Sequence, residues 1–264
     1  MTSELVKSSP FLRMSNHEYH SREAVSRSFL WRLLSTTPYH AIYDKTHRTE
    51  PTTAMRLGTA AHLAVLEPHE FKKQVVVTGV SRRSKSGKAI LESYEDNDLI
   101  VLSQNEHEQI LGMRDAIFRH PTAQHCFAGG QAEASLFAVD PRTGVPFKAR
   151  YDYVLCNNVF TDLKTTDDAS PKAFYYHALK LGYHVQAAQY LRVAKLNGID
   201  SEGFVFVAVE KNPPYAVACY HADEDFIHKG NVALDKALDV YCECKETGVW
   251  PGYPDTLLPI TMFK

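Results

Sequence analysis

Two different spacings of apolar residues divide this chain. In the first 120 residues, apolar side chains recur three or four positions apart, which predicts amphipathic helices. The clearest segments of this kind are 21–38, 53–68 and 103–120. The first two stop at Pro38 and Pro68, and the third opens with Ser103 followed three residues later by Glu106. A proline ends a helix and a Ser-x-x-Glu pattern begins one, so three separate helices are expected.

From about residue 130 the spacing changes to two, which is typical of strands with one buried face. The sequence PRTG at 141–144 predicts a turn between the first two strands. Ser170 and Pro171 predict the start of a helix, and Gly182 predicts its end. The predicted strands are 133–140, 145–155, 159–166, 203–211 and 215–222, and the predicted helices are 170–182, 183–198 and 223–248.

This order of elements predicts an α+β (mixed α/β) fold. We expect a central, mostly antiparallel or mixed sheet of about five strands, flanked by helices. The 264 residues contain no internal repeat and no low-complexity linker, so we expect a single domain over 1–264. Within it, a helical part should cover about 1–128, and a core that carries the sheet should cover about 129–248.

Composition narrows the class of protein. Hydrophobic residues at 44% and charged residues at 23% are ordinary for a globular protein in water. No apolar run has the length of a membrane span, and the first residues lack the apolar core of a signal peptide. We therefore expect a cytoplasmic protein without a membrane partner. The five cysteines are odd in number and irregularly spaced, which does not suggest a disulfide framework.

An unusual pair of charges lies inside the predicted strand 159–166. Asp162 and Lys164 are two residues apart, so they should project from the same face. Asp152, on the preceding strand, would face Asp162 across an antiparallel hairpin if the turn had an odd number of residues. A three-residue turn over 156–158 meets this condition, and its two asparagines tolerate left-handed backbone angles. We expect two carboxylates and one lysine on one surface; the alternative is a surface ion pair.

Two neighbouring aspartates repel each other unless a cation holds them, and Mg²⁺ and Mn²⁺ prefer carboxylate oxygen. A lysine beside such an ion can orient a water molecule or stabilise charge on a phosphate. The pattern therefore favours metal-assisted phosphodiester hydrolysis. His62 is a candidate third ligand and Glu133 a candidate ligand of a second ion. Gln186 and Tyr190, one helical turn apart, are candidate nucleotide contacts. The alternatives are a core histidine and an ordinary polar helix face.

This ordered series of residues resembles the PD-(D/E)xK nuclease superfamily and, more narrowly, the RecE-type (exonuclease VIII) catalytic domain. The resemblance covers about 14–253, nearly the whole chain. Its motifs are His62 in GTAAH, Glu133, Asp152, DLK at 162–164 and QAAQY at 186–190. In place of the glutamate of the family name, this chain has the shorter Asp162.

The resemblance implies an Mg²⁺-dependent exonuclease, with Mn²⁺ as an alternative, that holds one or two ions. It would digest one strand of linear double-stranded DNA from the 5′ end and leave a 3′ single strand for a RecT-like annealing protein. It would form a ring-shaped homotetramer. The implied metal ligands are His62, Asp152, Asp162, the Leu163 carbonyl and, for a second ion, Glu133. Lys164 would position or activate the attacking water, and Gln186 and Tyr190 would lie beside the substrate strand.

Segment 75–90 reads as a short strand, a basic loop and the start of a helix. The basic residues of this loop are Arg82, Arg83, Lys85 and Lys88. They are candidate DNA-backbone contacts, and the alternative is a solvated loop. Tyr175 and Tyr176 are interpreted as packing residues rather than base-stacking residues. Two other functions stay open: a non-catalytic DNA-end-binding or scaffold protein on the same fold, and a related nuclease with another role, such as a RecB-like domain.

Overall fold

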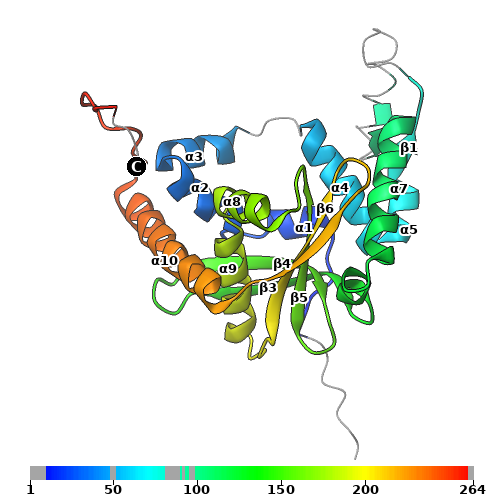
Figure 1. The fold of residues 1–264 in the computed structure, drawn as a ribbon. Helices are drawn as coiled ribbons and strands as arrows, with labels where there is room; N and C mark the ends of the chain where they lie inside the picture. Colours follow the sequence, from blue (N-terminus) through cyan, green and yellow to red (C-terminus); the bar gives the residue numbers. More distant parts are fainter. Residues whose placement is uncertain (1–9, 48–51, 81–89, 91–92, 95–98, 261–264) are drawn as a thin grey trace, which may run out of the picture.

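The computed structural model describes residues 10–47, 52–80, 90, 93–94 and 99–260, and a five-stranded sheet lies at its centre (Figure 1). The strands of this sheet are β3 (Gln131–Val139), β4 (Pro146–Val154), β5 (Val159–Thr166), β6 (Gly203–Glu210) and β7 (Val217–His221). The helices are α1 (Asn16–Ser21), α2 (Arg27–Ser35), α3 (Pro38–Thr46), α4 (Thr53–Leu66), α5 (Pro68–Gln74), α7 (Gln104–Arg119), the 3₁₀ helix η1 (Ala123–Phe127), α8 (Pro171–Leu181), α9 (Tyr183–Leu196) and α10 (Glu224–Thr247). A second, parallel sheet is made by β1 (Val75–Val77) and β2 (Ile100–Leu102). None of the described helices combines the length and the apolar character needed to cross a membrane.

The central sheet is mixed, as predicted. Its strand order is β3-β4-β5-β6-β7, and every neighbouring pair is antiparallel except β5 and β6, which are parallel. A parallel pair needs a long crossover connection, and here α8 and α9 provide it. The crossover therefore places these two helices directly after β5, the strand that carries Asp162 and Lys164.

The ends of several helices follow the predicted signals. The prolines predicted to end two helices also begin the next ones, because Pro38 is the first residue of α3 and Pro68 the first residue of α5. Proline suits this position since the N–H of the first helical residue has no partner within the helix. Ser103 forms the predicted capping box with Glu106, and Gly182, with a φ of 71°, ends α8.

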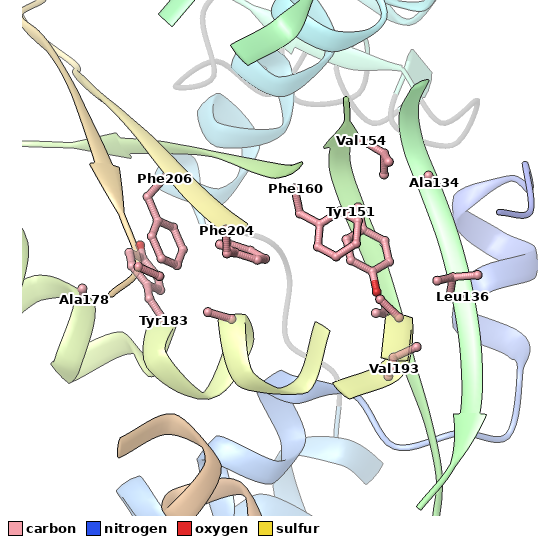
Figure 2. Packing of buried hydrophobic residues seen from close by; sticks show 14 of the residues in the cluster. Ala134, Leu136, Tyr151, Val154, Phe160, Ala178, Tyr183, Val193, Phe204 and Phe206 are labelled. Atoms are coloured by element: carbon pink, nitrogen blue, oxygen red, sulfur yellow. The ribbon is translucent and has the colours of Figure 1, made fainter. Parts of the chain in front are cut away.

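Both faces of the sheet are covered by apolar side chains. On one face, Phe160, Phe204 and Phe206 pack with Tyr151 and residues of α8 and α9 (Figure 2). On the other face, alternate residues of the same strands pack against α4 and α7. The even positions of β5 therefore point towards α9, and the charged side chains that share them are removed from bulk water.

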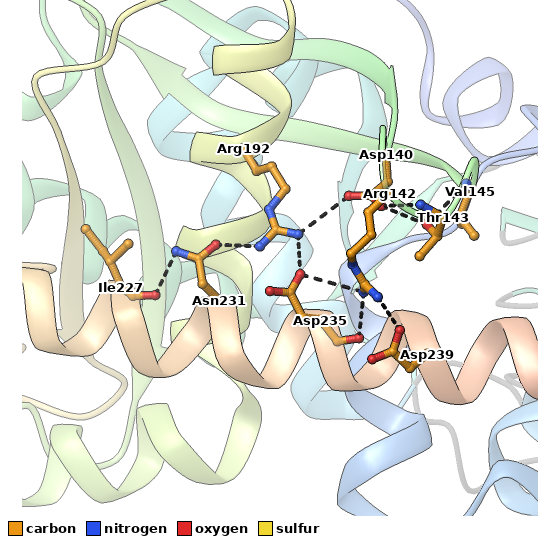
Figure 3. Close-up of polar contacts among 9 residues, drawn as sticks. All are labelled: Asp140, Arg142, Thr143, Val145, Arg192, Ile227, Asn231, Asp235 and Asp239. Atoms are coloured by element: carbon orange, nitrogen blue, oxygen red, sulfur yellow. Dashed lines mark hydrogen bonds and ion pairs between the residues drawn. The ribbon is translucent and has the colours of Figure 1, made fainter.

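Helix α9 is the most enclosed helix of this layer. Nine of its 14 residues are buried, and α10 packs along its outer side. Arg192 of α9 connects three elements (Figure 3): its guanidinium contacts Asp235 of α10 at 2.6 Å, Asn231 of α10 at 2.8 Å, and Asp140, just after β3, at 3.6 Å. This network fixes α9 between the sheet and α10.

The closest approach of α9 and α10 gives a stability prediction. A Cβ at Gly230 would lie 2.0 Å from the carbonyl oxygen of His184 and 2.9 Å from the Cβ of Ala188. Because the first of these is backbone, Gly230→Ala must push the helices apart, and we expect it to lower the free energy of unfolding by about 1–3 kcal/mol in urea denaturation.

Gly58→Ala is the matched control, because a Cβ at this helical position meets nothing within 4 Å. It should leave stability unchanged or raise it by up to about 1 kcal/mol. Equal stabilities of the two variants would contradict the close contact between α9 and α10.

Candidate functional site

The candidate site lies where β4 and β5 separate. These strands pair only through two residue pairs next to their turn. The turn consists of 156–158, and Asn158 has the left-handed φ of 58°, so the predicted three-residue turn is confirmed. In this register Asp152 and Asp162 occupy matching positions on the two strands. Beyond them the strands diverge, and side chains enter the space between.

Asp152 closes the gap between the diverging strands. Its Oδ2 atom accepts a hydrogen bond of 2.7 Å from the backbone N–H of Leu163. In a continuous ladder a carbonyl of β4 would accept this bond. The buried N–H is thus satisfied by a carboxylate, which fixes the carboxylate at the centre of the sheet.

Three side chains from three elements converge at this point. His62 of α4, Glu133 of β3 and Asp152 of β4 each have a potential metal-ligating atom, and these atoms all lie within 4.8 Å of one another. The His62 Nδ1 atom is 3.5 Å from the Asp152 Oδ2 atom. Glu133, at a φ of 51°, also forms an ion pair with Arg150 at 2.5 Å. No other group of this kind occurs in the described part of the chain.

The environment shifts the pKa values of all three groups. Burial raises the pKa of Asp152 well above its usual range, and the negative charge of Asp162 raises it further. Burial also raises the pKa of Glu133, with Asp152 adding to the effect and Arg150 opposing it. Burial lowers the pKa of His62, and the Lys164 ammonium lowers it further. A neutral imidazole is the form that binds metal.

Asp162 and Lys164 form the second half of the site. They share a face of β5, as predicted, and their charged atoms are 2.5 Å apart. Gln186 of α9 joins both: its Oε1 atom accepts a hydrogen bond of 3.2 Å from the Lys164 ammonium, and its Nε2 group donates to Asp162. Asp162, Lys164 and Gln186 thus form one polar cluster, and the predicted catalytic role of Lys164 and the predicted substrate contact of Gln186 stay predictions. Asp162 faces Lys164 and Gln186. It is not part of the group formed by His62, Glu133 and Asp152, called the three-residue group below, so its role as a metal ligand stays a prediction.

Sequence reasoning missed two arginines of this site. Arg27 of α2 donates to the Gln186 Oε1 atom at 3.0 Å and to the Leu181 carbonyl at 3.0 Å. No local spacing indicates this contact, since 159 residues separate Arg27 from Gln186. Arg150 had a usable signal, because it lies two residues before Asp152 on the same strand.

The other predicted residues have mixed outcomes. The ring of Tyr190 packs on Tyr151, with centroids 5.0 Å apart, in the core cluster. Burial raises the pKa of its hydroxyl well above the usual range. A substrate contact of Tyr190 stays a prediction. The predicted DNA contacts of the basic loop, Arg82, Arg83, Lys85 and Lys88, lie outside the described residues.

The interpretation of Tyr175 and Tyr176 as packing residues is wrong. Their side chains are 47% and 61% exposed. In α8 the buried positions are Phe174 and Ala178, and at 100° per residue both tyrosines fall outside that face.

The residues fit a divalent cation. One neutral imidazole and two carboxylates form a donor set that suits Mn²⁺ or Mg²⁺. The pKa values of both carboxylates are raised by burial and by a neighbouring negative charge, so they gain from a positive charge placed between them. The buried Asp162 Oδ2 atom adds an acceptor, because it has an ion pair with Lys164 but no hydrogen-bond partner.

Comparison with known proteins is consistent with this geometry. The model of a protein family described as a PDDEXK-like domain of unknown function matches residues 26–257. None of the curated proteins matches the chain. The fold is similar to a crystal structure described as a "Putative exonuclease" from Eubacterium rectale, with a TM-score of 0.69 at 13% identity, over 96% of this chain and 97% of that chain. At this identity the likeness shows a shared fold only. A further crystal structure, of SSO0001, has a TM-score of 0.40 at 14% identity, over 87% of this chain and 86% of that chain.

The raised pKa values predict how stability depends on pH without metal. Because Asp152 and Glu133 have higher pKa values in the folded protein, the native state binds more protons than the unfolded chain. The free energy of unfolding should therefore fall as the pH rises from about 4 through the raised pKa values. Asp152→Asn removes one charge and lets the amide oxygen accept the Leu163 N–H. In EDTA, its stability should fall less steeply between about pH 5 and 8 than that of the wild type.

Urea denaturation at several pH values measures this slope. The control is Asp200→Asn, at an exposed position outside the site, which should follow the wild-type curve. Parallel curves for the wild type and Asp152→Asn would contradict the burial of this carboxylate.

Proposed function

Because this chain belongs to the family of PDDEXK-like domains, we propose that it is a metal-dependent nuclease that hydrolyses phosphodiester bonds of DNA. The observation that carries the proposal is the arrangement of the three-residue group beside the Asp162–Lys164 pair. The two halves are joined through one residue of β5, since the N–H of Leu163 donates to Asp152 and its flanking residues are Asp162 and Lys164. An accidental surface ion pair would have no such connection.

The residues that would hold a divalent cation are His62, Glu133 and Asp152, with the Leu163 carbonyl beside them. Burial lowers the pKa of His62, and hydrogen bonding to the Leu163 backbone opposes this shift, which is the effect of an acceptor near the ring. When bound, the cation supplies positive charge that offsets the charge of the phosphate and favours ionisation of water.

Lys164 would orient the attacking water and stabilise negative charge that develops on the phosphate. Asp162 and Gln186 hold its ammonium at 2.5 and 3.2 Å, so few rotamers are open to it. Arg27 fixes the amide of Gln186 with its oxygen towards the two cations and its nitrogen towards Asp162. Asp162 would thereby orient the lysine, whereas Asp152 would help to hold the cation.

We further propose a 5′-to-3′ exonuclease that acts on linear duplex DNA and leaves a 3′ single strand for a RecT-like annealing partner in recombination. We also propose a homotetrameric ring in the cytoplasm. These finer statements rest on the resemblance of the motifs at 62, 152, 162–164 and 186–190 to RecE-type domains. Duplexes labelled at either the 5′ or the 3′ end separate the two directions of digestion, and analytical ultracentrifugation gives the subunit number.

Lys164→Ala tests the nuclease proposal. With Mg²⁺ and a linear duplex that carries 5′ phosphates, we expect the wild type to release nucleotides. The variant should be slower by about 10²–10⁴-fold, the usual contribution of a positioned proton-transfer or charge-stabilising group. Acid-soluble nucleotide release measures both rates.

Lys236→Ala, at an exposed position of α10, is the control and should keep the wild-type rate. Covalently closed circular DNA separates the modes of action: cutting of the circle would indicate an endonuclease. If the wild type binds DNA ends but releases nothing from either substrate, the protein is a scaffold and the proposal fails.

Metal removal gives a test that does not depend on activity. Protein treated with EDTA should gain thermal stability when Mn²⁺ or Mg²⁺ is added, by about 2.7 kcal/mol at a hundredfold excess over Kd. Glu133→Gln replaces one donor of the three-residue group, so its gain should be smaller at the same metal concentration. Differential scanning calorimetry measures the shift, and an equal gain in the variant would place the ion elsewhere.

A further inference from the structure

We propose that the exposed face of α8, formed by Lys172, Tyr176 and Lys180, binds a single-stranded segment of DNA next to the catalytic centre, with a base stacked on Tyr176. This inference deepens the proposed function and rests on it. The three-residue group and the Asp162–Lys164 pair do not define where the substrate strand lies, and the α8 face would hold part of it.

The helix places these three side chains on its solvent side. Phe174 and Ala178 define the buried side of α8, and at 100° per residue Tyr176 points directly away from it. Lys172 and Lys180 are four residues before and after Tyr176, so they are its neighbours along the helix surface. All three are exposed, and Tyr176 is 61% exposed.

The two lysines are available to an anion. The described ion pairs of lysine residues join Lys73, Lys164 and Lys211 to carboxylates, and neither Lys172 nor Lys180 is among them. Along a single strand, bases alternate with phosphates. The Tyr176 ring can stack on a base while the Lys172 and Lys180 ammonium groups contact the phosphates on either side.

The neighbour of Tyr176 in α8, His177, links this helix to the catalytic centre. The ring of His177, next to Tyr176, packs edge-to-face on Tyr183 with centroids 5.8 Å apart. The Lys164 ammonium lies 4.5 Å above the same Tyr183 ring. Burial lowers the pKa of His177, and the charges of Lys211, Lys180 and Lys164 lower it further. His177 and Lys164 thus contact the same tyrosine ring, which places α8 beside the catalytic centre.

The surface is held in a fixed position. At the end of α8, the Lys180 carbonyl accepts a hydrogen bond of 3.2 Å from the Trp31 indole, and the Leu181 carbonyl accepts one of 3.0 Å from Arg27. Both donors belong to α2, and Arg27 also contacts Gln186. A rigid platform binds a flexible strand at a lower entropic cost than a mobile one.

The chemistry favours a single strand over a duplex. A base can stack on a protein ring only if its face is free, and bases inside a duplex are stacked on each other. On the exposed face of α8, Tyr176 is not placed in a groove that could hold a duplex. The ring therefore suits an unpaired segment, which a nuclease that acts at the end of a duplex produces or separates.

Fluorescence anisotropy with a labelled 20-nucleotide oligo(dT), in EDTA so that no cleavage occurs, tests the proposal. Tyr176→Ala should weaken binding about tenfold, within the range for loss of one stacked base, while Tyr176→Phe should bind within about twofold of the wild type. The double variant Lys172→Ala/Lys180→Ala should reduce the slope of log K against log salt by about 1.4, or 0.7 for each phosphate contact.

Matched controls are Tyr43→Ala, an exposed tyrosine of α3, and Lys195→Ala/Lys236→Ala, two exposed lysines of α9 and α10. Both should bind as the wild type does. Unchanged affinity of Tyr176→Ala, an unchanged salt slope of the lysine double variant, or an equal loss of binding to a blunt duplex would overturn the proposal.

Nucleotide release from linear duplex by the same proteins separates this proposal from the proposed function. If the wild type releases nucleotides in a Lys164-dependent manner and the α8 variants bind oligo(dT) normally, only the role of α8 is overturned. If the wild type releases no nucleotides, the nuclease function itself is overturned.

Discussion

The buried ion pair between Asp162 and Lys164 is the interaction on which the rest of the structure depends. Asp162 is 1% exposed, and burying two charges costs several kcal/mol per ion unless further hydrogen bonds satisfy them. Gln186 supplies these bonds to both partners. Its helix must therefore keep its position relative to the sheet, and the contacts of α9 with Gly230 and the Arg192 network serve that purpose.

The second constraint is the separation of β4 from β5. A sheet with helices on both faces has no natural opening for a substrate, and a continuous ladder would bring the two strands together over their full length. Because pairing stops after two residue pairs, a carboxylate can enter the sheet and take the Leu163 N–H. The same gap admits His62 from α4 on one side and leaves Lys164 towards α9 on the other, so both halves of the site meet across a single strand.

Local rules explain what could be predicted from the sequence. The period of two placed Asp162 and Lys164 on one face, and the parity of a three-residue turn placed Asp152 opposite. The contact of Arg27 with Gln186 could not be predicted, because it joins segments 159 residues apart and depends on how α2 packs. Strand β2 has three residues, too few to show an alternating pattern. The exposure of Tyr176 could not be predicted, because a helix made largely of apolar residues does not reveal which of its sides will be covered.

The two aspartates have different surroundings. Asp162 faces a lysine and an amide donor, so its negative charge is already compensated. Asp152 has one backbone N–H and a histidine kept neutral by its lowered pKa, and burial raises its own pKa well above the usual range. A cation beside Glu133 and Asp152 would relieve two carboxylates at once. The geometry thus places the carboxylates that could hold a cation next to the lysine, because Leu163 lies between Asp162 and Lys164 and donates to Asp152.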